Sequence, residues 1–198
     1  MKKVLFIAAF AAVSLTSSAQ FAKGDSYISG NVGFTSSSKK LNSTTTVLEN
    51  KTDLSVSPNY GYFVTNNIAV GVGLGYGMNT TKNDATGAKI VDGSTLSAGV
   101  FARYYTTPAK AFSFFGNLGV NYTSGTEKLP TSVKTTGFDV AIAPGISYFV
   151  SNRLAIESTI GSLGYSTKKR DVTGAVASSD FGLNLNLSSI RFGAVYKF

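Results

Sequence analysis

Apolar residues alternate with small or polar residues along most of this chain. The clearest stretch is "IAVGVGLGYGM", where apolar side chains at every even position from Ile68 to Met78 alternate with Ala69 and four glycines. Successive side chains of a β-strand point to opposite faces, so this stretch predicts a strand with one apolar and one nearly bare face. A bare face suits the inside of a narrow barrel, where bulk is not tolerated.

The same alternation recurs and predicts an all-β fold, an eight-stranded antiparallel up-and-down barrel. The expected strands are 26–36, 52–64, 67–79, 94–106, 111–123, 136–150, 153–165 and 181–198. The seventh loses its pattern around Ser162, and the eighth changes phase near Ser188–Ser189, where we expect a β-bulge. No stretch after the first twenty residues has a convincing helical period.

Charged residues within the strands fall on the face opposite the apolar one. We therefore predict a polar network in the lumen, built from Asp53, Asn59, Arg103, Asn117, Asp139, Glu157 and Arg191. Alternation alone does not say which face points inward. A soluble barrel would bury the apolar face, whereas a transmembrane barrel turns it toward lipid.

Two patterns favour the transmembrane arrangement. The connections after the second, fourth and sixth strands are short, whereas the others run to roughly 12 to 16 polar residues. Aromatic residues also gather at the strand ends, which predicts two interfacial girdles. Near the short turns we place Tyr60, Tyr62, Phe63, Tyr104, Tyr105, Phe112, Tyr148, Phe149, Tyr196 and Phe198, and near the long loops Phe34, Tyr76, Tyr122, Phe138, Tyr165 and Phe181.

The amino-terminal residues predict export. A basic "MKK", an apolar "VLFIAAFAAVSL" and a small-residue region ending at Ala19 form a signal peptide over residues 1–19, leaving a barrel domain over 20–198. The apolar run is too short for a membrane-spanning helix, which takes about 20 residues. The chain carries a net charge of +8, and in an exported protein this charge favours anionic lipids over nucleic acid as partners.

Two segments are near copies of each other, "PNYGYFVTNNIAV" at 58–70 and "PGISYFVSNRLAI" at 144–156. A repeat of this kind indicates how the fold is built, so we consider it before any single motif. We interpret the copies as equivalent hairpin corners, half a barrel apart, each joining two strands through a short turn.

With its "YFV-S/T-N" repeats, its signal ending "SAQ" and its final strand "SIRFGAVYKF", the chain resembles the small eight-stranded OmpA/OmpX-like outer-membrane barrels, of the type found in Bacteroidota. The resemblance implies an integral protein of the bacterial outer membrane with periplasmic N and C termini. It implies that Tyr196 and Phe198 are read by the outer-membrane assembly machinery. It also implies a structural or surface-interaction role, in adhesion or envelope protection. The absence of Trp departs from the usual girdle composition.

The residues do not favour chemistry in the lumen. With neither His nor Cys, a serine nucleophile lacks its usual base, so we expect no enzyme, no metal site and no cofactor. The inward acids and bases are better interpreted as ion pairs, because an unpaired buried charge is costly. The alternative function is a narrow channel or a carrier of small apolar ligands or lipids.

Basic residues of the long loops are the other candidate site. We expect phosphates of lipopolysaccharide to contact Lys39, Lys40, Lys51, Lys168, Lys169 and Arg170. The alternative is that these side chains only keep the loops solvated. Further partners would be outer-membrane lipids and host or cell-surface ligands reached through the loops.

Overall fold

The computed structural model describes residues 21–40, 47–128, 132–184 and 191–198. The predicted signal peptide therefore lies outside the described residues. In the described part, no helix is long and apolar enough to span a membrane.

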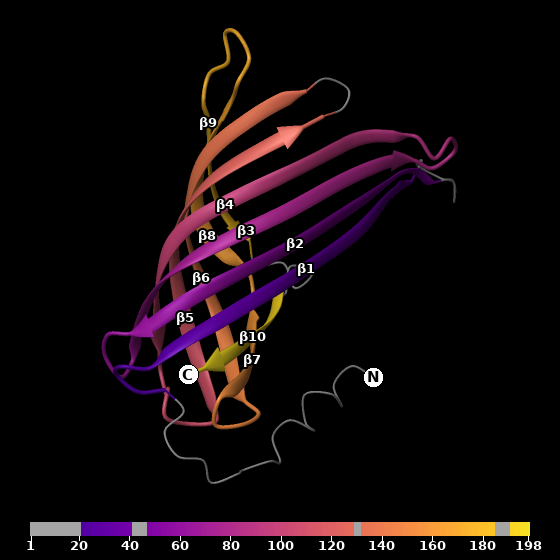
Figure 1. Ribbon diagram of the computed structural model, residues 1–198. Helices are drawn as coiled ribbons and strands as arrows, with labels where there is room; N and C mark the ends of the chain where they lie inside the picture. Colours follow the sequence, from indigo (N-terminus) through magenta and orange to yellow (C-terminus); the bar gives the residue numbers. More distant parts are fainter. Residues whose placement is uncertain (1–20, 41–46, 129–131, 185–190) are drawn as a thin grey trace.

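All regular structure among the described residues belongs to one antiparallel sheet that curls into a barrel (Figure 1). The strands are β1 (Ser26–Lys40), β2 (Val47–Phe63), β3 (Ile68–Asn83), β4 (Lys89–Tyr105), β5 (Phe112–Glu127), β6 (Val133–Phe149), β7 (Leu154–Thr159), β8 (Ser162–Arg170), β9 (Ser178–Asn184) and β10 (Arg191–Lys197).

These segments occupy eight positions around the ring, so the predicted eight-stranded barrel is confirmed. β7 and β8 both pair with β6 and together form the seventh position, while β10 and β9 form the eighth. The ring closes where Tyr27–Val32 of β1 pair with β10. Farther along, no pairing among the described residues joins β9 to β1, and Figure 1 shows these two strands apart there.

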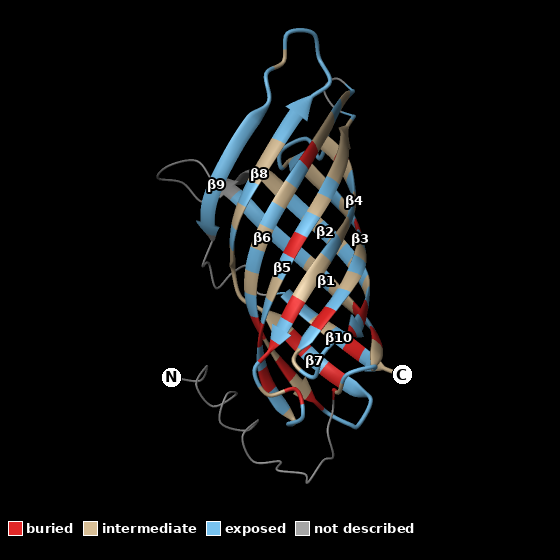
Figure 2. Ribbon diagram, turned by 90° about the vertical axis from the view of Figure 1, so that its left-hand side faces the viewer, coloured by how far each residue is buried: buried red, intermediate tan, exposed pale blue. Residues whose placement is uncertain are grey.

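The two ends of the barrel differ. One end, which we call the turn end, carries the short connections 64–67, 106–111 and 150–153 together with Phe21 and Phe198. The other end, the loop end, carries the connections 84–88 and 171–177. Most of the buried residues gather near the turn end (Figure 2).

The apolar face points outward, as the transmembrane reading predicted. Val32 and Leu74 are about three-fifths exposed (61% and 60%), and their neighbours around the outer surface are mostly apolar. The inner face carries mainly Gly, Ser, Thr and Asn. This is the arrangement of a barrel whose solvent on the outside is lipid rather than water.

The strands reach farther toward the loop end than predicted. β3 continues to Asn83 rather than 79, and β4 begins at Lys89 rather than 94, so the connections there are shorter than the expected 12 to 16 residues. The β3 extension is polar on both faces, so alternation of apolar residues cannot reveal it, and the β4 extension has one apolar residue on each face, Ile90 and Val91. The interruption around Ser162 is real: Gly161 has a φ of 69° between β7 and β8. The predicted bulge at Ser188–Ser189 lies outside the described residues.

The glycines of β3 provide a matched test of how crowded the lumen is. A methyl group at Gly71 would overlap the carbonyl oxygen of Tyr60 and the ring of Phe101. At Gly77 the nearest atoms are backbone oxygens 3.8 and 4.0 Å away. We expect Gly71→Ala to lower the free energy of unfolding by about 1–3 kcal/mol, and Gly77→Ala to be neutral or stabilising by up to about 1 kcal/mol. Urea unfolding in lipid vesicles measures both; equal effects would contradict the crowding.

Candidate functional site

A buried ion pair crosses the lumen between strands that are not neighbours. Nη1 of Arg103 on β4 donates to Oε2 of Glu157 on β7 at 2.6 Å, and the two residues are only 6% and 4% exposed. The Tyr105 hydroxyl accepts from Arg103 at 3.1 Å and donates to Oε1 of Glu157 at 3.0 Å. Oδ1 of Asn117 accepts from Nε of Arg103 at 3.1 Å. Both charges are therefore paired and hydrogen-bonded, which a buried ion pair requires.

Aromatic rings enclose the guanidinium of Arg103. Its central carbon lies 4.4 Å from the ring centroid of Phe115 and 5.6 Å from that of Phe101. Cation–π contacts of this kind stabilise a desolvated cation beyond its ion pair. Each of these two rings lies over an inward glycine of the adjacent strand, Gly145 or Gly71, which leaves the room that the ring occupies.

The other predicted members of the network lie elsewhere in the lumen. Asp139 accepts a hydrogen bond from Asn121 at 2.9 Å, and Asp53 pairs with Lys51 at 3.2 Å. Asn59 donates to the carbonyl of Ser57 at 3.1 Å, and Arg191 lines a hollow described below. Of the seven predicted residues, the structure thus brings together Arg103, Asn117 and Glu157. Tyr105, which joins them, was not among them.

Below the ion pair, buried aromatic rings close the turn end. We call this cluster the aromatic seal; its members are Phe21, Tyr27, Phe63, Tyr105, Phe115 and Phe149. Phe21 lies at its centre and is 2% exposed. Its ring centroid is 4.5 Å from that of Phe63, 4.7 Å from Phe149 and 5.2 Å from Tyr105.

Hydrogen bonds fix the segment that carries Phe21. Its backbone N–H donates to the carbonyl of Pro108 at 3.0 Å, and the N–H of Gly24 donates to the carbonyl of Phe63 at 2.9 Å. Gly24 has a φ of 96°, a conformation that favours glycine. The carboxylate of Asp25 accepts from the N–H of Ala22 at 2.8 Å and pairs with Lys197 at 3.1 Å.

The two repeated segments form the same type of turn and contribute the same aromatic residue. In the first turn the hydroxyl of Thr65 accepts from the N–H groups of Asn67 and Ile68. In the second, the hydroxyl of Ser151 accepts from those of Arg153 and Leu154. Each copy also contributes the phenylalanine of "YFV" to the aromatic seal.

This placement corrects part of the predicted girdle. Phe63, Tyr105 and Phe149 point inward rather than toward lipid. Each stands next to another aromatic residue, in "YF" or "YY", and adjacent strand residues face opposite sides. One ring of each pair therefore had to enter the lumen, a signal that was present in the sequence.

Above the ion pair, toward the loop end, the side chains that the structure describes do not fill the lumen. A cavity of about 600 Å³ opens there, lined by polar side chains that include Asn117, Asn121, Asp139, Asp180 and Arg191. We call this cavity the hollow. The predicted polar network therefore does not fill this part of the lumen, because Gly119, Gly164 and Gly182 supply no side chains to fill it.

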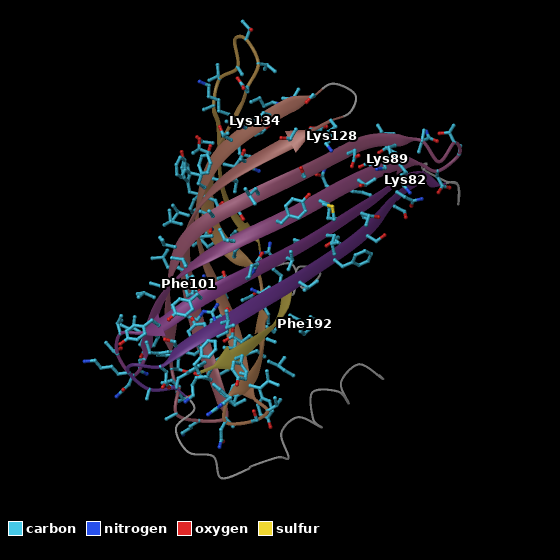
Figure 3. All side chains as sticks on the ribbon, in the orientation of Figure 1. Lys82, Lys89, Phe101, Lys128, Lys134 and Phe192 are labelled. Carbon is cyan, nitrogen blue, oxygen red and sulfur yellow. The ribbon has the colours of Figure 1, made fainter. Side chains whose placement is uncertain are left out.

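The predicted lipopolysaccharide contacts lie at the loop end. Lys168, Lys169 and Arg170 end β8, and Lys51 lies near the start of β2. Arg170 is 3.9 Å from Glu127. The side chains of Lys39 and Lys40 lie outside the described part. Figure 3 places further basic residues, Lys82, Lys89, Lys128 and Lys134, at the same end.

The last residues lie on the outer surface of the turn end. The rings of Tyr196 and Phe198 pack edge to face with centroids 5.5 Å apart, and the N–H of Phe198 donates to Ser26 at 3.0 Å. Among the described residues, no three His, Cys, Asp or Glu side chains are grouped as a metal site would need.

Comparison with known proteins agrees with this architecture. The model of the outer membrane protein beta-barrel domain matches residues 5–198. The fold is similar to that of OprG from Pseudomonas aeruginosa, with a TM-score of 0.56 and 18% identity over 90% of this chain and 97% of OprG. It is also similar to Neisserial surface protein A, with a TM-score of 0.51 and 15% identity over 89% and 99% of the two chains. At these identities the likeness concerns the fold alone. Among curated proteins, none matches the chain. The match to the family model covers nearly the whole chain, which therefore belongs to the outer membrane protein beta-barrel domain family.

Proposed function

We propose that this outer membrane protein is a non-enzymatic, non-conducting barrel with a structural and surface-interaction role. The observation that carries the proposal is the obstruction of the lumen at the turn end. There the Arg103–Glu157 ion pair and the aromatic seal occupy successive layers of a narrow ring. An eight-stranded barrel is just wide enough for side chains to fill it, so two such layers leave no continuous water path.

The proposed orientation places the turn end in the periplasm and the loop end outside the cell. The longest described connection, 171–177, lies at the loop end, and the terminal aromatic pair of Tyr196 and Phe198 lies at the turn end; both support this orientation. We also propose that the outer-membrane assembly machinery recognises this pair and that the barrel is of the Bacteroidota type.

At the loop end we propose contact with phosphates of lipopolysaccharide. Lys169 shares the outward parity of Tyr165 on β8, so its ammonium group can reach the lipid headgroups beside the barrel. Lys168 lies on the opposite, inward face of β8. Lys51 lies on the same inward face of β2 as Asp53, so both ammonium groups face the rim of the lumen. Arg170 adds a guanidinium, which binds phosphate in a bidentate manner.

Charge removal tests this contact. The triple variant Lys168→Gln, Lys169→Gln and Arg170→Gln should bind lipopolysaccharide micelles at least about tenfold more weakly, because several charge-assisted contacts are lost together. The measurement is binding of refolded barrel to the micelles at low and at physiological salt. The double variant Lys110→Gln and Arg153→Gln at the turn end is the control and should bind normally. Equal binding by all three proteins would leave the basic residues with a solvating role only.

The alternative functions have less support. A narrow channel would need a path past Arg103, Glu157 and the aromatic seal. A carrier of apolar ligands would need an apolar cavity, whereas the lining of the hollow includes the charged residues Asp139, Asp180 and Arg191 beside its apolar ones. The hollow therefore suits a polar ligand better than a lipid.

A further inference from the structure

The walls of the hollow follow from strand register. Asn121, Asp139, Ser166 and Asp180 are paired in sequence across β5, β6, β8 and β9, so their inward side chains form one polar row. The next row toward the turn end is Gly119, Ala141, Gly164 and Gly182, which carries nothing larger than a methyl group. Asn117 and Ala143 belong to the row after that, and the row beyond it, which we call the third row, contains Phe115, Gly145, Thr159 and Arg191. The bare row lies between the polar row and these residues, and it provides the space of the hollow.

The hollow has charges of both signs that do not neutralise each other. Asp139 and Asp180 belong to the first row and Arg191 to the third. Every Asp and Glu of the chain lies among the described residues, and none of them forms an ion pair with Arg191. Nor does either aspartate form one with any basic side chain that the structure describes. In the same lumen the charges of Arg103 and Glu157, which lie deeper, are paired with each other.

The distance between these charges restricts the ligand. Along β6 the first and third rows are six residues apart (145 − 139), or about 20 Å at the usual rise of a strand. Arg191 lines the hollow, and with its long side chain extended toward the first row the gap between the charged groups is about 10–15 Å. A free amino acid is too short to reach both ends. A peptide of about four residues in extended conformation matches the gap at 3.3–3.6 Å per residue.

We propose that the hollow binds short peptides with free ends, the terminal ammonium group at Asp139 and Asp180 and the terminal carboxylate at Arg191. The bare row leaves room for the peptide backbone and small side chains, and Asn117 and Asn121 offer amide groups to it. Because the turn end is closed, the peptide enters and leaves through the loop end. This inference does not depend on contact with lipopolysaccharide, which uses other residues.

Calorimetric titration of the refolded barrel tests the proposal with tetra-alanine as the probe. We expect one peptide bound per barrel, and at least about tenfold weaker binding when the amino end is acetylated or the carboxyl end amidated, since each change removes a charge-assisted contact. A peptide that binds no better than its doubly blocked form, or not at all, would overturn the proposal.

Two variants assign the ends of the peptide. Arg191→Gln should bind free and amidated tetra-alanine equally, while still discriminating against the acetylated form. The double variant Asp139→Asn and Asp180→Asn should bind free and acetylated tetra-alanine equally, while still discriminating against the amidated form. Asp53→Asn removes a lumen carboxylate outside the hollow and should change neither preference. The heat-dependent shift in gel mobility shows that each variant has folded. Unchanged preferences in folded variants would contradict the assignment.

Discussion

Replacing Glu157 with alanine should lower the free energy of unfolding by about 3–5 kcal/mol, the usual cost of leaving one partner of a buried ion pair alone. Arg103 would remain at 6% exposure with its positive charge intact. Its remaining partners, Asn117 and the Tyr105 hydroxyl, are neutral. Tyr105 would also lose the carboxylate to which it donates. Equilibrium unfolding by urea in phospholipid vesicles measures the change.

Two controls separate the ion pair from other effects of this substitution. Asp53→Ala removes a lumen carboxylate whose pair with Lys51 is partly exposed, and such pairs contribute about 0–1 kcal/mol. The double variant Arg103→Met and Glu157→Leu replaces both charges by apolar groups and should recover most of the loss, because no buried charge is left unpaired. If Glu157→Ala costs no more than Asp53→Ala, the ion pair is not what holds the two walls of the barrel together.

Sequence periodicity predicted the barrel well because its walls obey a local rule. Whether Val72 or Gly73 faces lipid depends only on the alternation around it, and one face of β3 is apolar from Ile68 to Met78. The alternation of apolar and small residues ends where the strand leaves the membrane. Beyond Met78 both faces of β3 are polar, so the strand continues to Asn83 without any signal that alternation could detect.

The candidate site was less predictable because its contacts cross the lumen. Arg103 and Glu157 lie on β4 and β7, which share no hydrogen bonds, so no register links them in the sequence. Their inward direction was predictable, but their mutual contact required the barrel radius and tilt. The row of Asp139, Ser166 and Asp180 depends on the interruption at Gly161, which sets the register of β8.

The role of Phe21 was the hardest to predict from the sequence. It stands between the predicted signal peptide and the first strand, where no alternation assigns it a face. Its neighbours suggest only a polar turn. Its burial becomes evident only in the structure, where Phe63 and Phe149, one from each repeat, contact it from opposite sides of the barrel. The repeat therefore has a structural reason, since both copies build the same seal.

Phe21→Ala should accordingly lower the free energy of unfolding by about 3–5 kcal/mol, the cost of a large cavity in a packed core. Phe114→Ala is the matched control, because Phe114 is 59% exposed on the outer surface and lipid fills the space that its ring vacates. Phe21→Leu should fall between the two, since leucine fills part of the cavity. Urea unfolding of the three variants in the same vesicles gives the comparison.

Conductance in planar bilayers distinguishes a structural role of Phe21 from a sealing role. Phe21→Ala alone should stay at background, because Arg103, Tyr105 and Glu157 still cross the lumen above it. Combining it with Arg103→Ala and Glu157→Ala opens a gap in both obstructing layers and should allow small ions to pass, provided that the gel mobility shift confirms folding. A wild-type barrel that conducts as well as this triple variant would show that the layers do not close the lumen, and the non-conducting role would be wrong.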